Sequence, residues 1–240
     1  ILIIRPRTAA TSIGLGDSAS GTLNLTDAEI ANIQTDFSDV RFGIETTGAH
    51  TIEVDGAATF SGSNVTMWGD DITLKSTLNV GANAVVLYIG QTTDGTFDYQ
   101  NPVTAASLTV NGGSNDDTFT LTTTSHDNTT INGVGGSENE LIGPNASNVW
   151  TISGDNAGNI VTGANTTNFS VIQNLIGNVD NDSFTFDNNW QISGTTGIDG
   201  AAGAGNTITG PSTVNNTWLI NGDEAGTLTP AGAAGATKFV

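Results

Sequence analysis

The sequence contains no cysteine, and only five of its 240 residues are lysine or arginine. Without thiols the chain can form neither disulfide bonds nor thiolate metal sites, which excludes zinc ribbons and dithiol redox centres. Its 24 aspartates and glutamates give a formal net charge of −19, which opposes binding to nucleic acid or anionic lipid. No apolar run approaches the roughly 20 residues that a membrane-spanning helix needs. We therefore expect no nucleic-acid partner and no transmembrane segment.

Short apolar runs recur along the whole chain, separated by Gly, Asn, Asp and Ser. In residues 119–121 (FTL) and 184–186 (FTF), apolar residues alternate with threonine. Alternation at a period of two is typical of strands with one buried face, and no stretch sustains the 3.6-residue period of a helix. The exception is 26–33, where Thr26 and Glu29 have the spacing of a capping box. We predict an all-β chain with one short helical insert near residues 26–33.

A long internal repeat occupies the C-terminal half, with an offset of about 67 residues. Residues 149–158 (VWTISGDNAG) return as residues 217–226 (TWLINGDEAG). Three further pairs match in the same order: 116–119 with 181–184, 131–144 with 198–211, and 166–169 with 236–239. We take the last match as the start of a third copy and expect the array to continue beyond residue 240.

The repeat favours a solenoid over a β-sandwich, the other fold that short strands at short intervals allow. In a solenoid each coil stacks on the last about 4.8 Å away, and small residues and asparagine suit the corners. One copy divides into three coils of about 22 residues, which matches the interval between Gly112-Gly113 and Gly135-Gly136. We predict a parallel β-helix (β-solenoid) with coils of about 22 residues. Residues 1–100 form irregular coils and residues 101–240 carry the repeat.

Three motifs follow one another near the N-terminus: IRPRTAA (4–10), IGLG (13–16) and GTLNLTDAEI (21–30). Together with the coil-like segment 71–82, they resemble the R-P-x-T-A, I-x-L-G and L-x-L-[ST]-D-A-E-[LI] motifs of filamentous-haemagglutinin-like giant exoproteins. The resemblance covers about the first 90 residues. It implies a right-handed β-helix that is secreted to the bacterial cell surface as part of an adhesin or extracellular filament.

One segment is similar to the calcium-binding nonapeptide G-G-x-G-x-D-x-U-x. Residues 112–120 (GGSNDDTFT) follow this pattern except at Asn115, and residues 177–185 keep its acidic and apolar positions. The candidate calcium ligands are Asp116, Asp117, Asp180 and Asp182. A calcium ion needs six to eight oxygens, yet the turns here are about 23 or more residues apart instead of about nine. Plain corners of a β-helix are the alternative interpretation, and calcium is the one cofactor left open.

We do not expect an enzyme. The pairs Asp70-Asp71 and Asp116-Asp117 offer two carboxylates, as glycoside hydrolysis needs, but adjacent residues of a strand point to opposite faces. A polysaccharide lyase needs a basic residue over its groove, and between residues 8 and 237 only Arg41 and Lys75 carry a positive charge.

Histidine and tryptophan are the remaining candidates for a site. We expect His50 and His126 to be polar surface residues. A row of tryptophans can bind carbohydrate, but Trp150 and Trp218 recur inside apolar strands, which favours packing. The same expectation covers the full set: Trp68, Trp150, Trp190 and Trp218.

The predicted function is mechanical. We expect a structural shaft segment of a large secreted cell-surface filament, adhesin or extracellular matrix fibre. Its partners would be neighbouring segments of the same long chain, other copies, or glycans and receptors on a cell surface. A calcium-stiffened adhesive stalk is the second hypothesis, and a glycan-binding or glycan-active β-helix is the third.

Overall fold

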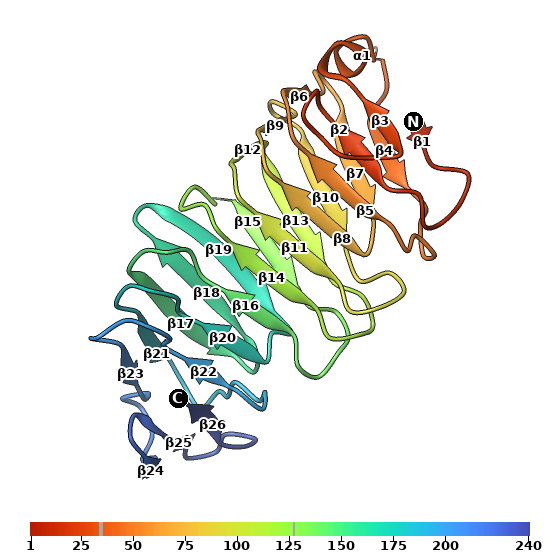
Figure 1. The fold of residues 1–240 in the computed structure, drawn as a ribbon. Helices are drawn as coiled ribbons and strands as arrows, with labels where there is room; N and C mark the ends of the chain where they lie inside the picture. Colours follow the sequence, from red (N-terminus) through yellow and green to blue (C-terminus); the bar gives the residue numbers. More distant parts are fainter. Residues whose placement is uncertain (34–35, 127) are drawn as a thin grey trace.

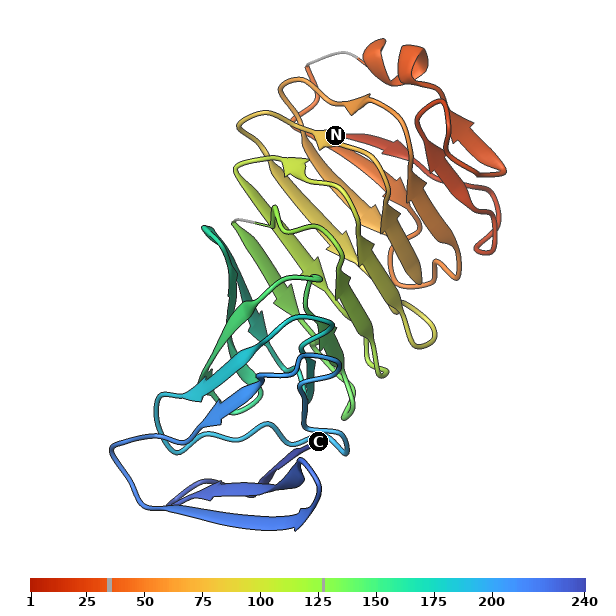
Figure 2. The same ribbon diagram turned by 60° about the vertical axis from the view of Figure 1, so that its left-hand side comes forward.

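The computed structural model describes residues 1–33, 36–126 and 128–240. Within these ranges the chain forms 26 strands and one short helix, so the prediction of an all-β chain is confirmed. Most strands belong to two long mixed sheets, here called sheets A and B. The strands of each sheet lie side by side along the length of the molecule, and the termini lie at opposite ends (Figures 1 and 2).

The chain alternates between the two sheets, so that strands of sheet A and strands of sheet B mostly follow one another in the sequence. In spatial order, sheet A contains β1 (Leu2–Ile4), β4 (Asp39–Gly43), β7 (Asn64–Trp68), β10 (Ala84–Tyr88), β13 (Ser107–Asn111), β15 (Thr129–Asn132), β19 (Asn165–Ser170), β18 (Ala157–Thr162), β17 (Asn148–Gly154), β21 (Ser183–Phe186) and β23 (Thr207–Thr209). Sheet B contains β24 (Asn216–Gly222), β25 (Ala225–Pro230), β26 (Thr237–Phe239), β22 (Ile198–Asp199), β20 (Asn174–Ile176), β16 (Glu140–Ile142), β14 (Thr118–Leu121), β11 (Thr96–Tyr99), β8 (Asp71–Leu74), β5 (Thr51–Val54), β2 (Ile13–Leu15) and β3 (Leu23–Leu25). A short third sheet contains β12 (Val103–Thr104), β9 (Leu78–Asn79) and β6 (Ala58–Thr59).

Most neighbouring strands pair in parallel, and the partner strand comes one passage of the chain later. Val65 pairs with Val40 on one side and with Val85 on the other. Val85 pairs in turn with Leu108. From β4 to β15 the paired residues lie 20 to 25 positions apart in the sequence.

In-register pairing places apolar side chains directly over one another inside the molecule. One inward column of sheet A consists of Phe42, Met67, Leu87, Val110, Ile131 and Phe169. One inward column of sheet B consists of Ile13, Ile52, Ile72, Phe97, Phe119, Leu141, Leu175 and Ile198. All of these side chains are buried, and they belong to a single core. The alternation of apolar residues with threonine therefore produces a continuous core along the molecule.

The predicted helical insert is present as α1 (Asp27–Ala31). Thr26 Oγ1 accepts a hydrogen bond from the Glu29 N–H, and Glu29 Oε2 accepts one from the Thr26 N–H, so the capping box is confirmed. Ile30 is buried and anchors the helix at the N-terminal end of the molecule, beside β3 (Figure 1).

Two antiparallel meanders interrupt the parallel pairing, and the sequence analysis did not foresee them. The first meander is β17–β18–β19 in sheet A, and the second is β24–β25–β26 in sheet B. The repeated segments 149–158 and 217–226 form the first hairpin of each. Asn156 and Glu224 occupy the same turn position with φ of 55° and 59°, a left-handed conformation that lets the strand reverse within two residues.

The in-register pairing of sheet A predicts a specific cross-link. Val86 pairs with Thr109 in the adjacent strand, and Thr66 lies one strand further away on the same outward face. Adjacent strands are about 4.8 Å apart, within the range of about 4.4–6.8 Å that a disulfide spans, and the next strand is about twice as far. We expect the Val86→Cys/Thr109→Cys variant to form an intramolecular disulfide on mild oxidation. The measurement is the intact mass and the loss of free thiols, and the cysteine-free parent gives no background.

The matched control is Thr66→Cys/Thr109→Cys, which should keep both thiols free at the same oxidant concentration. Equal cross-linking of the two variants would contradict the register.

Candidate functional site

Buried polar side chains form a ladder at the corner where the chain enters sheet B. Asp117, Asn139 and Gln173 directly precede β14, β16 and β20. Gly95 N–H donates to Asp117 Oδ1 at 2.7 Å. In the same way Asp117 N–H donates to Asn139 Oδ1 at 2.7 Å, and Asn139 N–H to Gln173 Oε1 at 3.0 Å. Each side chain therefore satisfies a backbone N–H of the preceding turn of chain. We call this set the B-corner ladder.

A second ladder of the same kind stands at the entry to sheet A. Asn148 N–H donates to Asp182 Oδ1 at 3.0 Å, and Asp182 N–H donates to Asn206 Oδ1 at 2.8 Å. Asp182 and Asn206 are the repeat equivalents of Asp117 and Asn139. The corner that precedes sheet B in the first copy of the repeat therefore precedes sheet A in the second copy. We call this second set the A-corner ladder.

The calcium candidates Asp116 and Asp117 face backbone N–H groups. Both carboxylate oxygens of Asp117 are occupied, Oδ1 by Gly95 N–H and Oδ2 by Gly113 N–H, each at 2.7 Å. Asp116 Oδ1 accepts the N–H groups of Ser137 and Glu138 at 2.7 and 2.9 Å. These oxygens act as corner acceptors, which is the alternative that the nonapeptide-like pattern left open.

Asp180 and Asp182 lie at the other corner, in front of β21 of sheet A, so the two candidate pairs are not brought together. Asp180 is exposed and Asp182 is buried. In the described ranges, no three His, Asp or Glu side chains gather into a group that could hold a metal ion.

The pKa values of the corner aspartates shift in different directions, depending on how deeply each carboxylate is buried. Desolvation raises the pKa of Asp117, against the opposing effect of its two N–H donors. Desolvation also raises the pKa of Asp182, against the opposing effect of Asn148 and the Trp150 indole. The N–H groups of Ser137 and Glu138 lower the pKa of Asp116, which is much less buried. Ionisation of Asp117 and Asp182 therefore opposes folding, whereas ionisation of Asp116 favours it.

The expectation that both histidines lie on the surface is wrong. His50 and His126 are buried, at 3% and 0% exposure. His50 Nδ1 contacts the Ala9 carbonyl at 2.9 Å, so this nitrogen carries the proton. His126 Nδ1 contacts Thr167 Oγ1 at 2.8 Å, while the Thr167 hydroxyl donates to the His126 carbonyl. Each imidazole thus ties together chain segments that are 41 residues apart.

Three of the four tryptophans pack as expected, and one does not. Trp190 is partly buried and packs against the core. Trp150 is fully buried and stacks on Phe184, with ring centroids 5.4 Å apart. Trp68 is buried and stacks on Tyr88 on the outer side of sheet A. Trp218 is 42% exposed, which contradicts the core position expected from its match to Trp150. The difference arises because β24 is the last strand of sheet B and β17 is not.

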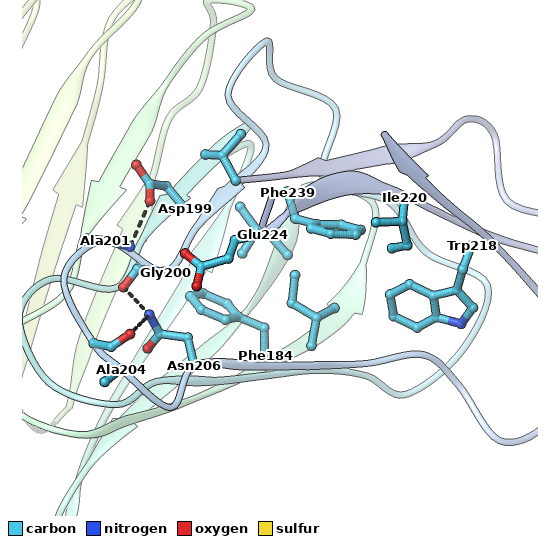
Figure 3. A pocket seen from close by; sticks show the side chains of 14 residues that line it. Phe184, Asp199, Gly200, Ala201, Ala204, Asn206, Trp218, Ile220, Glu224 and Phe239 are labelled. Atoms are coloured by element: carbon cyan, nitrogen blue, oxygen red, sulfur yellow. Dashed lines mark hydrogen bonds between the residues drawn. The ribbon is translucent and has the colours of Figure 1, made fainter. Parts of the chain in front are cut away.

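Trp218 lines a cavity at the C-terminal end of the molecule (Figure 3). This cavity has a volume of about 370 Å³, and Phe184, Ile220 and Phe239 form much of its apolar wall. Asp199 and Glu224 also line it, without a basic side chain beside them. Another, more open cavity of about 400 Å³ is lined by Tyr88, Val134, neutral polar side chains and glycines. Neither lining combines two carboxylates with a base.

The B-corner ladder predicts a large effect of Asn139→Ala. Asn139 is fully buried, its Oδ1 accepts Asp117 N–H, and its Nδ2 donates to the Gly135 and Val171 carbonyls. Removing the side chain leaves these backbone groups without partners, which should cost about 2 kcal/mol or more in the free energy of unfolding. The measurement is urea denaturation followed by circular dichroism. As the control, Asn188→Ala at an exposed corner should change stability by about 0.5 kcal/mol or less, and equal effects would exclude the ladder as a stabilising element.

Asp182 predicts a difference in the pH dependence of stability. Because burial raises its pKa in the folded state, its contribution is fully present below the ordinary value of about 3.9 and is lost as the pH rises through the folded-state pKa. Asp182→Asn cannot ionise, so the variant should lose less stability than the parent between pH 3 and pH 7. Asp223→Asn removes the same charge from an exposed position that is not among the groups acting on Asp182, and it should follow the parent profile. Parallel profiles for Asp182→Asn and the parent would contradict the buried ionisation.

No family model matches the sequence, and no curated protein or solved structure matches it. In the part of the chain that the structure describes, no helix is both long and apolar enough to cross a membrane.

Proposed function

We propose that the chain is a right-handed parallel β-helix and serves as the shaft segment of a secreted cell-surface filament, adhesin or matrix fibre. The observation that carries this proposal is the continuous in-register parallel pairing from β4 to β15, at 20 to 25 residues per step. An extended stack joined by backbone hydrogen bonds at every step resists bending and stretching. The twelve strands of sheet B correspond to about 53 Å at about 4.8 Å per step.

A right hand is supported by the general behaviour of parallel strands. Connections between parallel strands of one sheet are right-handed in about 98% of cases, because strands carry a right-handed twist. The resemblance of the first 90 residues to filamentous-haemagglutinin-like exoproteins supports the same hand and the location at the cell surface.

The arrangement of acidic residues supports an exposed rod. In one outward column of sheet B, Glu53, Thr73, Asp98 and Thr120 pair in succession, so a threonine separates the two carboxylates. Like charges placed directly opposite each other in a sheet are destabilising. The alternation lets a chain with a net charge of −19 stack in register and keep an acidic surface, which discourages lateral association.

The two other hypotheses find less support. The oxygens of Asp117 and one oxygen of Asp116 already accept N–H groups, which leaves few free ligands for a calcium-stiffened stalk. For glycan binding, Trp68 and Trp150 keep only 8% and 0% exposure, so Trp218, at 42%, is the one strongly exposed tryptophan, and a single ring does not form a row. A sugar ring would need an open aromatic face.

Location on cells that produce the protein tests the shaft proposal. Antibodies raised against the chain should label intact cells in immunogold electron microscopy, with gold particles along fibres outside the cell. Calcium chelation should leave the labelled fibres in place and should shift the melting temperature of the purified chain by less than about 2 °C. Pre-immune serum and cells lacking the gene are the controls.

Label found only after permeabilisation would overturn the surface proposal. A larger loss of thermal stability in chelator, restored by added calcium, would favour the calcium-stiffened stalk.

A further inference from the structure

The two meanders have the same internal geometry. Trp150 pairs with Ile160 across the first hairpin, and Trp218 pairs with Leu228 across the second. The Trp150 and Phe169 rings are 6.1 Å apart at 63°, and the Trp218 and Phe239 rings are 6.0 Å apart at 64°. The second meander is therefore a structural copy of the first, and what contacts the first is a guide to what the second can bind.

In the first meander the outer edge is covered by β21. Phe184 pairs in parallel with Trp150 and stacks on its indole at 5.4 Å and 16°. Asp182, just before β21, accepts the N–H of Asn148 at the start of β17. The strand, the stacked ring and the corner carboxylate together bury Trp150 completely.

In the second meander the equivalent edge is open. β24 ends sheet B, and it exposes Trp218, Leu219 and Ile220 to 42%, 58% and 64%. Three consecutive exposed apolar residues on an edge strand are unusual in a protein that stays monomeric, because such an edge pairs readily with another strand.

The cavity beside β24 corresponds to filled space in the first copy. Six of its lining residues are Phe184, Ile198, Ile208, Trp218, Ile220 and Phe239 (Figure 3). Their repeat equivalents are Phe119, Ile131, Leu141, Trp150, Ile152 and Phe169. All six equivalents are 3% exposed or less, since further strands, including β21, pack over them. The open edge and the cavity therefore form one unfilled site.

We propose that β24 and the adjoining cavity are a docking site for the opening strand of a further repeat unit, equivalent to β21. The occupant is an extended segment of the type Asn-Asp-[Ser/Thr]-Phe-Thr-[Phe/Leu], which the chain itself contains at residues 181–186 and, with Asp in place of the Asn, at 116–121. It pairs in parallel with β24, lays its first phenylalanine on the Trp218 indole, and directs its aspartate to the Asn216 N–H. Backbone pairing supplies the affinity and the phenylalanine supplies the specificity. The site does not depend on where the rod is located in a cell.

A synthetic peptide of residues 180–188 (DNDSFTFDN) tests this docking site on the intact chain. Both partners are acidic, so the titration is run at about 0.3 M salt to screen their repulsion. We expect saturable shifts in the indole N–H and backbone amide resonances of 216–222, and reduced acrylamide quenching of Trp218 fluorescence. The peptide with Phe184→Ser should bind about tenfold or more weakly, because the stacked ring is lost.

Two protein variants separate edge docking from non-specific binding. Trp218→Ala removes the stacking partner and should weaken peptide binding about tenfold, whereas Trp190→Phe changes a tryptophan outside β24 and should leave the titration unchanged. Equal binding by Trp218→Ala and the parent would overturn the proposal.

A tethered version keeps the test decisive if the free peptide binds too weakly to detect. Val240 is the repeat equivalent of Ser170, so residues 171–188 appended after Val240 would place a second β21 segment beside β24 at high effective concentration. Trp218 should then be protected from quenching, and should stay exposed when both phenylalanines of the appended segment are replaced by serine. Exposure of Trp218 in both extended chains would overturn the proposal. Dimers of the unextended chain that the Trp218→Ala substitution abolishes would also overturn the proposal, because the occupant of the β24 edge would then be a second copy of the chain.

Discussion

The structure depends on one constraint: every inner strand must find backbone partners on both of its sides, and outside the two meanders these partners lie one passage of the chain earlier and one later. Because these pairings are in register, a residue on one passage fixes the environment of the residue above it. The inward columns must be apolar throughout, as the series from Phe42 to Phe169 is. Where the backbone turns from one sheet to the other, no strand supplies the partner, and a buried side chain takes its place. The ladders through Asn139 and Asn206 do this at the two corners.

The same register explains the unusual composition. Stacked passages repeat any charge about every 4.8 Å, so an acidic chain needs neutral spacers between its carboxylates. Threonine suits this role because it favours strands and keeps a polar surface, as Thr73 does between Glu53 and Asp98. Asparagine at the corners accepts an N–H without adding charge. Aspartate does so only with burial of a carboxylate, which raises the pKa of Asp117 and Asp182.

Local sequence patterns predicted the features that depend on neighbouring residues alone. The alternation of apolar residues with threonine gave the strands, and Thr26 with Glu29 gave the capping box. The meanders escaped prediction because a hairpin and a parallel crossover use similar residues. The available signal was the close succession of three strand-length segments, 148–154, 157–162 and 165–170, with only two residues between neighbours. Burial of His50 and His126 depends on partners 41 residues away, Ala9 and Thr167, which no spacing rule links to them. The exposure of Trp218 follows from its edge position, which sequence identity with Trp150 conceals.

The placement of the meanders has a geometric reason. A meander contributes three strands to a sheet where the chain otherwise contributes one, so it lengthens its own sheet by two strands relative to the other. A first meander in sheet A alone would splay the two sheets apart. One repeat copy, from β14 to β20, enters a sheet five times, an odd number, so the next copy begins on the opposite sheet. The second meander consequently falls in sheet B and restores the balance, with 11 strands in one sheet and 12 in the other. Because each repeat enters the sheets an odd number of times, successive meanders fall in opposite sheets. Long antiparallel hairpins can therefore recur in a stack that stays extended.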